Sequence, residues 1–206
     1  MLKRKTIIAI AIVLVVNVGI YFVGTDGFTA FTAEEARTQE LTDHQPLFPE
    51  VTLEDSQART YPFSEFEGQY VFMTFFYSAC SDVCIELEEN MAEVFEATEN
   101  LHDQVQFLSI SFDPERDKPE VLDNYRQYFG SDGEDWRMAR INNQDELQSL
   151  LDAFEVIVIP DGNDHYTHNS AFYLVNPDGR LIDVMDFRDI DGAVDRLENV
   201  LESEGG

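Results

Sequence analysis

The sequence predicts an α/β domain in which helices cover both faces of a mixed central sheet. Apolar, β-branched runs at residues 69–77 and 105–112 each precede a helical pattern, which is typical of parallel strands joined by helices. A hairpin pattern at residues 171–185, followed by a final helical segment, adds antiparallel strands. The only two cysteines, Cys80 and Cys84, come between the first run and its helix, which matches a thioredoxin-like layout with a wider cysteine spacing than C-x-x-C.

Residues 1–24 are predicted to form one N-terminal transmembrane helix. Basic residues 3–5 precede an apolar stretch at residues 6–23, which is close to the length that spans the hydrocarbon of a bilayer. The basic end is expected in the cytoplasm, so a single pass would place the domain on the extracytoplasmic side of the cell membrane. The alternative is a signal peptide cleaved near residues 28–30, which also exports the domain.

Residues 25–47 are predicted to be an acidic linker, because they are polar and show no sustained period. Residues 48–206 are predicted to be the thioredoxin-like domain. It is expected to begin with a short strand at 51–53, and the aromatic and β-branched residues at 69–77 indicate a buried strand.

The segment after the cysteines is predicted to be a helix over residues 83–100. Leu87, Met91 and Val94 recur at helical spacing, and the glutamates are expected on the opposite face. After the strand at 105–112, Asp117 is expected to cap a helix that runs to about residue 129.

The second half of the chain continues the pattern. We expect a short strand at residues 136–139, a helix capped by Asn143, and an apolar segment at 156–159. A polar loop at residues 161–169 then leads to the hairpin, whose two strands are joined by a turn at 176–179.

The net charge of the chain is −28. Without residues 3–5, the remaining 10 basic and 41 acidic residues give a charge of −31. Such a surface repels polyanions, which argues against nucleic-acid binding. Because salt screens self-repulsion, the acidic composition indicates a high-salt environment; a docking surface for a basic partner is the alternative reading.

The cysteine pair is the strongest candidate for chemistry. At i and i+4 of a helix, Cys80 and Cys84 share one face, where they can form a disulfide or bind a soft metal ion. A purely structural disulfide is the less favoured reading, because so short a loop gives little stabilisation. Both thiols are expected near a helix N-terminus, where the dipole favours the thiolate.

Two thiolates leave a metal ion incompletely coordinated, so the four histidines are candidate third ligands. His44 falls in the predicted linker, and His102 is expected to be a solvated surface residue. His165 and His168 precede the hairpin, which approaches the cysteine turn in a thioredoxin-like sheet. A Cys₂His set suits Cu(I), and Cu(II) or Zn²⁺ are further possibilities.

Four blocks of sequence resemble the Sco/SenC family of membrane-anchored copper proteins. Residues 74–84 resemble its C-x-x-x-C region, and residues 108–122 resemble its DPERD-x-PE segment. Residues 168–179 resemble its His-containing loop and hairpin, and residues 63–71 resemble the approach to the cysteine strand. The blocks occur in the family's order, and the likeness extends over about residues 48–202.

The resemblance implies a chaperone that binds one copper ion through Cys80, Cys84 and His168. The implied function is assembly of the dinuclear copper site of cytochrome c oxidase, with oxidase subunit II or a related copper acceptor as the partner. His165 is the fallback ligand. The chain departs from the family in having Ser81 and Ile85 where prolines usually follow the cysteines, and Thr167 where Asp commonly precedes the histidine.

Other functions remain open at the level of sequence. The second hypothesis is a thiol–disulfide oxidoreductase, in which Cys80 and Cys84 are the redox-active pair and reduce cysteines of the acceptor without holding copper. A thioredoxin-like adaptor with an inert disulfide is a third reading, and a peroxidase is weaker because nothing marks either cysteine as a peroxidatic thiol.

Overall fold

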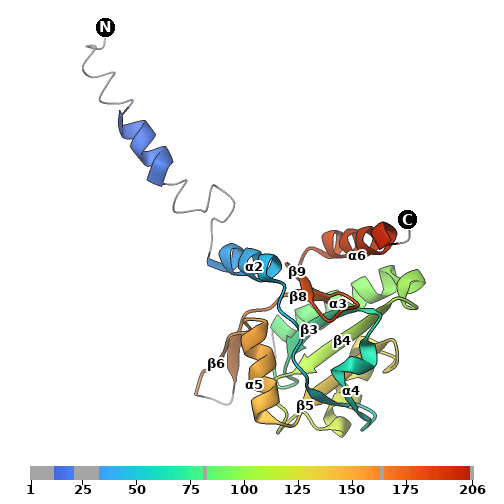
Figure 1. The fold of residues 1–206 in the computed structure, drawn as a ribbon. Coiled ribbons are helices and arrows are strands. Elements are labelled where there is room, and N and C mark those ends of the chain that lie inside the picture. Colours follow the sequence, from blue (N-terminus) through green and yellow to red (C-terminus); the bar gives the residue numbers. More distant parts are fainter. Residues whose placement is uncertain (1–11, 21–32, 81–82, 163–164, 205–206) are drawn as a thin grey trace.

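A seven-stranded mixed sheet forms the centre of the domain in the computed structural model, which describes residues 12–20, 33–80, 83–162 and 165–204 (Figure 1). The strands lie in the order β2-β1-β5-β4-β3-β8-β9. β3, β4 and β5 are parallel neighbours, and the remaining pairs are antiparallel. The bounds are β1 Thr52–Asp55, β2 Thr60–Pro62, β3 Tyr70–Phe76, β4 Val105–Ser111, β5 Trp136–Ile141, β8 Phe172–Val175 and β9 Leu181–Met185. The predicted mixed sheet is confirmed, with β2 as a strand that the sequence did not indicate.

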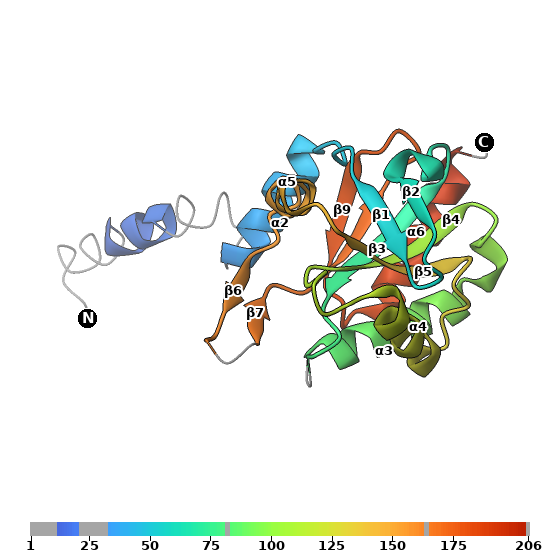
Figure 2. The ribbon, with the colours of Figure 1, turned by 90° about the horizontal axis from the view of Figure 1, so that it is seen from below.

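Helices cover both faces of this sheet, as predicted (Figures 1 and 2). α3, α4 and α6 pack together on one face, whereas α5 packs against β5 from the other. Asn143 caps α5 as expected, because its Oδ1 accepts the amides of Asp145 at 3.0 Å and Glu146 at 3.3 Å. The helices are α3 Val83–Ala97, α4 Pro119–Phe129, α5 Gln144–Ala153 and α6 Ile190–Glu204, with 3₁₀ turns at Phe63–Phe66 and Glu99–Leu101.

Strand β3 leads directly to the cysteines and is buried along its whole length. Its successive side chains enter opposite faces of the sheet. Phe76 stacks on Tyr125 of α4 at a ring-centroid distance of 5.0 Å, whereas Phe75 packs edge-on against Phe154 beyond α5 at 6.2 Å. Aromatic packing on both faces therefore holds rigid the strand end from which the cysteine turn extends.

A second, two-stranded sheet projects beside the main one (Figure 2). It consists of β6 (Val158–Pro160) and β7 (Tyr166–His168), paired antiparallel so that Val158 lies opposite His168. The expectation of a polar loop over residues 161–169 is therefore wrong for its second half. The strand pairing there was hidden because β7 is short and polar.

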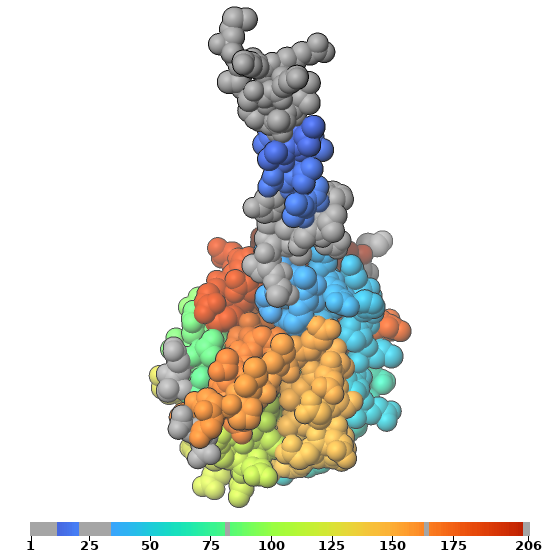
Figure 3. Space-filling view, turned by 90° about the vertical axis from the view of Figure 1, so that its left-hand side faces the viewer, coloured from blue at the N-terminus to red at the C-terminus, as the bar shows by residue number. Residues whose placement is uncertain are grey.

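Helix α2 (Ala33–His44) lies within the segment predicted to be a linker. Its Leu41 is buried, and the guanidinium of Arg37 donates to the carbonyl oxygens of Phe154 and Glu155. Figure 3 shows α2 in light blue against the domain surface, and the helix packs against β9. Part of the predicted linker is therefore a docked helix, because one buried leucine and one arginine hold a segment whose pattern is otherwise polar.

The predicted transmembrane segment falls mostly outside the described residues. Of residues 1–24, the structure describes 12–20, which are helical and carry exposed apolar side chains. Among the helices described, none combines the length and the apolar character needed to cross a bilayer.

Candidate metal centre

The cysteine turn begins immediately after β3. Cys80 lies in this turn, where its amide donates to the carbonyl oxygen of Tyr77 at 3.2 Å, and Cys84 lies in the first turn of α3. Both cysteines are free thiols; Cys84 is fully buried and Cys80 is partly exposed. The intervening residues 81–82, which include Ser81, lie outside the described part of the chain.

The two cysteines contact each other across this turn. The Cys84 amide donates to the Cys80 sulfur at 3.4 Å. A hydrogen bond with the Cys80 thiol, together with burial, raises the pKa of the Cys84 thiol. The expectation that the helix dipole favours the thiolate is therefore wrong for Cys84 in the metal-free protein, because hydrogen bonding and desolvation outweigh the dipole.

His168 also contacts Cys84. The imidazole Nε2 lies 3.3 Å from the Cys84 sulfur, although 84 residues separate the two in sequence. The Nδ1 atom lies 3.1 Å from the carbonyl oxygen of Asn169, and it can only donate to this oxygen. Burial lowers the pKa of His168, so its neutral form is favoured with the Nε2 lone pair directed at the sulfur.

The three candidate ligands are neighbours without forming a finished site. Across the described residues, no group of three or more His, Cys, Asp or Glu side chains has an arrangement that could hold a metal ion. Cys84 and His168 are in contact, and Cys80 reaches the Cys84 amide.

The other histidines lie elsewhere. His165 is exposed, and His44 is exposed on α2, where Nδ1 lies 2.9 Å from the carbonyl oxygen of Glu40. His102 is not the solvated residue that the sequence indicated. It stacks on Phe95 with ring centroids 4.1 Å apart, and Nε2 lies 3.0 Å from that residue's carbonyl oxygen.

Aromatic side chains surround the His168 ring. Phe112 packs edge-on against it at a centroid distance of 4.9 Å, and Tyr77 lies at 6.4 Å. Tyr166 makes edge contacts with both of these rings. This apolar surrounding removes part of the imidazole surface from water.

Asp117 hydrogen-bonds to the segment that leads into the cysteine turn. Its carboxylate accepts hydrogen bonds from the Ser78 amide at 3.0 Å, from the Ser78 hydroxyl, and from the Ser111 hydroxyl at 2.5 Å. The expectation that Asp117 caps α4 is wrong, because Lys118 occupies the N-cap position and no side chain caps the helix. The carboxylate instead ties the end of β4 to the turn that carries Cys80.

Glu88 is a further buried acid near the sulfurs that sequence reasoning missed. It lies one helical turn after Cys84, on the inner face of α3 rather than with the other glutamates outside. One carboxyl oxygen accepts from the Ser109 hydroxyl at 2.9 Å, and the other has no hydrogen-bond partner. Burial raises the pKa of Glu88 to about 8. Its spacing from Cys84, on the same helix face, was the signal available in the sequence.

An open cavity of about 620 Å³ adjoins this centre. His168 and Val83 line it on the side of the cysteine turn, and Glu35, Met185 and Asp186 line it on the side of α2 and β9. The histidine is therefore accessible from the surface through this cavity.

Comparison with known proteins identifies relatives across most of the chain. The family model described as SCO1/SenC matches residues 39–202. The SCO1 protein homolog of Bacillus subtilis (strain 168) is 28% identical over 149 residues, covering 70% of this chain and 76% of that protein. Yeast Sco1, solved with copper bound, has a similar fold, with a TM-score of 0.65 and 23% identity over 77% of this chain and 90% of that one. BsSco, a member of the Sco family of cytochrome c oxidase assembly proteins with a disulfide switch, has a TM-score of 0.66 and 21% identity over 75% and 93%.

Proposed function

Because the chain belongs to the SCO1/SenC family, we propose that it is a copper chaperone that carries one copper ion on Cys80, Cys84 and His168. The recipient in this proposal is the dinuclear copper site of cytochrome c oxidase, in subunit II or a related acceptor. Support for the cargo comes from yeast Sco1, which has been solved with copper bound. Support for the recipient comes from BsSco, a member of a family of oxidase assembly proteins.

The observation that carries the proposal is the 3.3 Å approach of His168 Nε2 to the Cys84 sulfur. A neutral imidazole nitrogen and a cysteine sulfur that contact each other are two donors suited to soft copper. The Nδ1 atom donates its proton to the Asn169 carbonyl oxygen, which leaves the Nε2 lone pair free to coordinate.

Loading releases protons from the thiols. A cysteine coordinates as the thiolate, so copper displaces the Cys84 proton despite the raised pKa of that thiol. The Cys84 thiol therefore stays protonated in the metal-free protein, and the site becomes anionic when it holds Cu(I) on two thiolates. Copper leaves by ligand exchange toward an acceptor that binds it more tightly.

Membrane attachment is part of the proposal. The basic residues 3–5 and the apolar residues 6–23 support a single N-terminal pass, with residues 48–206 as an extracytoplasmic domain that follows a connecting segment at 25–47. A cleaved signal would give the same side of the membrane without the anchor.

A thiol–disulfide oxidoreductase is the second candidate function. Cys80 and Cys84 are free thiols in contact with one another, which is the reduced state that such an activity needs. Transfer of two electrons to an acceptor disulfide would join the two sulfurs and reduce the acceptor's cysteines. His168 has no part in that reaction.

Copper stoichiometry of the purified, reduced protein tests the first function. We expect about one copper per chain in the wild type, and loss of stable binding in Cys80→Ser, Cys84→Ser and His168→Ala. His165→Ala is the matched control, because its imidazole is exposed three residues away, and it is expected to bind as the wild type does.

Thiol exchange with a disulfide substrate separates the two functions. A His168→Ala protein that loses copper but keeps its exchange rate would assign the two activities to different residue sets. Full copper binding by His168→Ala, or its loss in His165→Ala, would contradict the proposed ligand set.

A further inference from the structure

Tyr77 connects the two halves of the candidate metal centre. It follows β3 directly, and its side chain is buried. Its hydroxyl oxygen accepts the Tyr166 amide at 3.2 Å and donates to the Tyr166 carbonyl oxygen at 3.5 Å. A single side chain therefore binds both main-chain groups of a residue on β7, two positions before His168.

The register of the small sheet explains why these main-chain groups need such a partner. The Asp161 amide donates to the His165 carbonyl oxygen, so the next pair, Pro160 and Tyr166, is one whose main-chain groups point away from the partner strand. The amide and carbonyl of Tyr166 thus face the outer edge of β7. The Tyr77 hydroxyl takes the place that a neighbouring strand would take there.

Arg116 reinforces the same connection. Its guanidinium carbon lies 6.0 Å from the centroid of the Tyr77 ring and 5.6 Å from that of Tyr166. The two tyrosine rings meet edge to face at 5.2 Å. A cation close to both rings adds attraction between the cysteine turn and β7 without a covalent link.

Phe112 also packs against Tyr166 and His168, but these ring contacts fix no main-chain group of β7. No strand of the seven-stranded sheet pairs with β6 or β7 in the described residues. The Asn169 side chain bonds to the Ile157 amide and the Glu155 carbonyl oxygen, which secures the base of the hairpin rather than β7 itself.

We propose that Tyr77 is a positioning residue, whose hydroxyl ties β7 to the cysteine turn and so holds the His168 imidazole against the Cys84 sulfur. For copper, this inference rests on the proposed function: the tether prepares the third ligand in advance and lowers the ordering cost of coordination. Opening of the tether would withdraw the imidazole and leave copper on two sulfurs, which favours transfer.

The first test needs no copper. Tyr77→Phe removes only the hydroxyl, so we expect the ring packing to remain and the Tyr166 amide to exchange with solvent faster in the metal-free protein. Residue-resolved hydrogen exchange measures this. Tyr128→Phe, which removes an exposed hydroxyl on α4, is the control and is expected to leave the Tyr166 amide unchanged.

The second test asks whether Tyr77 acts through His168. Loss of one such hydrogen bond is expected to weaken Cu(I) affinity by about 3- to 10-fold in competition with a chromogenic chelator. In a His168→Ala background, Tyr77→Phe is expected to cause no further change, since the group that it positions is gone.

The outcomes separate this inference from the proposed function. An unchanged Tyr166 exchange rate in Tyr77→Phe would overturn the tether, as would an equal loss of affinity with and without His168. Failure of the wild type to bind copper would overturn the proposed function, whereas faster Tyr166 exchange would still establish the tether.

Discussion

Glu88 places a carboxyl group with no access to water one helical turn from the Cys84 sulfur. Its only hydrogen bond comes from Ser109, whose oxygen in turn accepts the Trp136 indole N–H at 3.1 Å. A buried carboxylate with one partner is costly, so the neutral acid is favoured. The group therefore stays protonated at a pH where an exposed glutamate is ionised, which keeps an extra negative charge away from the sulfurs.

This burial makes stability depend on pH in a defined direction. The folded-state pKa is about 8, well above the value near 4.5 of a free glutamate. The contribution of Glu88 to folding stability is fully present below its unfolded-state pKa. It is lost as the pH rises through its folded-state pKa, by on the order of 5 kcal/mol in total. Glu88→Gln cannot ionise, so its unfolding free energy relative to wild type is expected to rise steadily between pH 5 and pH 8.

Denaturant unfolding followed by the fluorescence of Trp136, the single tryptophan, measures this at constant salt. Glu89→Gln is the control, because Glu89 is exposed on the same helix. Parallel pH profiles for wild type and Glu88→Gln would show that Glu88 ionises freely in the folded protein.

Helix α2 shows how a mostly polar segment becomes part of the domain. Its residues lack a helical apolar stripe, so docking depends on a few contacts, above all Leu41. The helix also provides Glu35 to the cavity beside His168. The segment before the sheet therefore contributes to the surroundings of the candidate metal centre.

Truncation of Leu41 tests this docking. The side chain is 3% exposed, so Leu41→Ala is expected to lower the unfolding free energy by about 2–5 kcal/mol through lost burial and a residual cavity. Leu47→Ala is the matched control, because Leu47 is 54% exposed, and a change within about 0.5 kcal/mol is expected. Equal effects from both variants in urea unfolding would contradict a docked α2.

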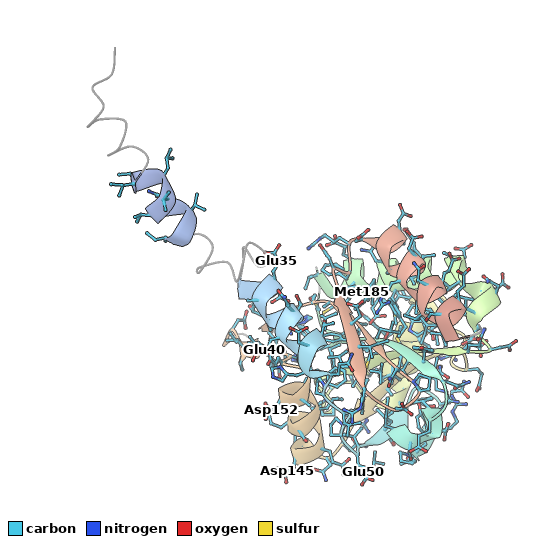
Figure 4. All side chains as sticks on the ribbon, turned by 45° about the horizontal axis from the view of Figure 1, so that its top comes forward. Glu35, Glu40, Glu50, Asp145, Asp152 and Met185 are labelled. Atoms are coloured by element: carbon cyan, nitrogen blue, oxygen red, sulfur yellow. The ribbon has the colours of Figure 1, made fainter. Side chains whose placement is uncertain are left out.

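The whole molecule carries far more acidic than basic groups. Exposed acids occur on several elements, and Figure 4 labels Glu35 and Glu40 on α2, Asp145 and Asp152 on α5, and Glu50 before β1. Some acids are paired, as where Arg59 binds the buried Asp55 and the exposed Glu134. With 13 basic and 41 acidic residues in the chain, most acids have no cation available to them.

Salt is therefore expected to stabilise the fold. The screening length falls from about 30 Å at 0.01 M to about 3 Å at 1 M, which removes most of the repulsion between surface acids. The unfolding free energy of the purified chain is expected to rise with NaCl, most steeply at low concentration. A free energy that stays constant or falls between 0.01 and 1 M would contradict the high-salt interpretation of the composition.

By itself, the sequence determined most strands of the central sheet, the helix after the cysteines and the family, because each depends on periodicity or motifs among neighbouring residues. β3 and the Asn143 cap are examples: their apolar run and capping residue specify them locally. The weak local patterns of α2 and β7 did not specify those elements, because their structure depends on contacts with the rest of the domain.

Only the tertiary structure decided which side chains meet. His168 reaches Cys84 across 84 residues, Asp117 binds Ser78 across 39, and Glu88 turns inward to Ser109 across 21. Such contacts depend on how separate elements pack, and on whether burial outweighs the cost of desolvating a polar group. The sequence therefore predicted two neighbouring sulfurs and several candidate histidines. The packing of β7 against the cysteine turn decided which imidazole lies beside the sulfurs.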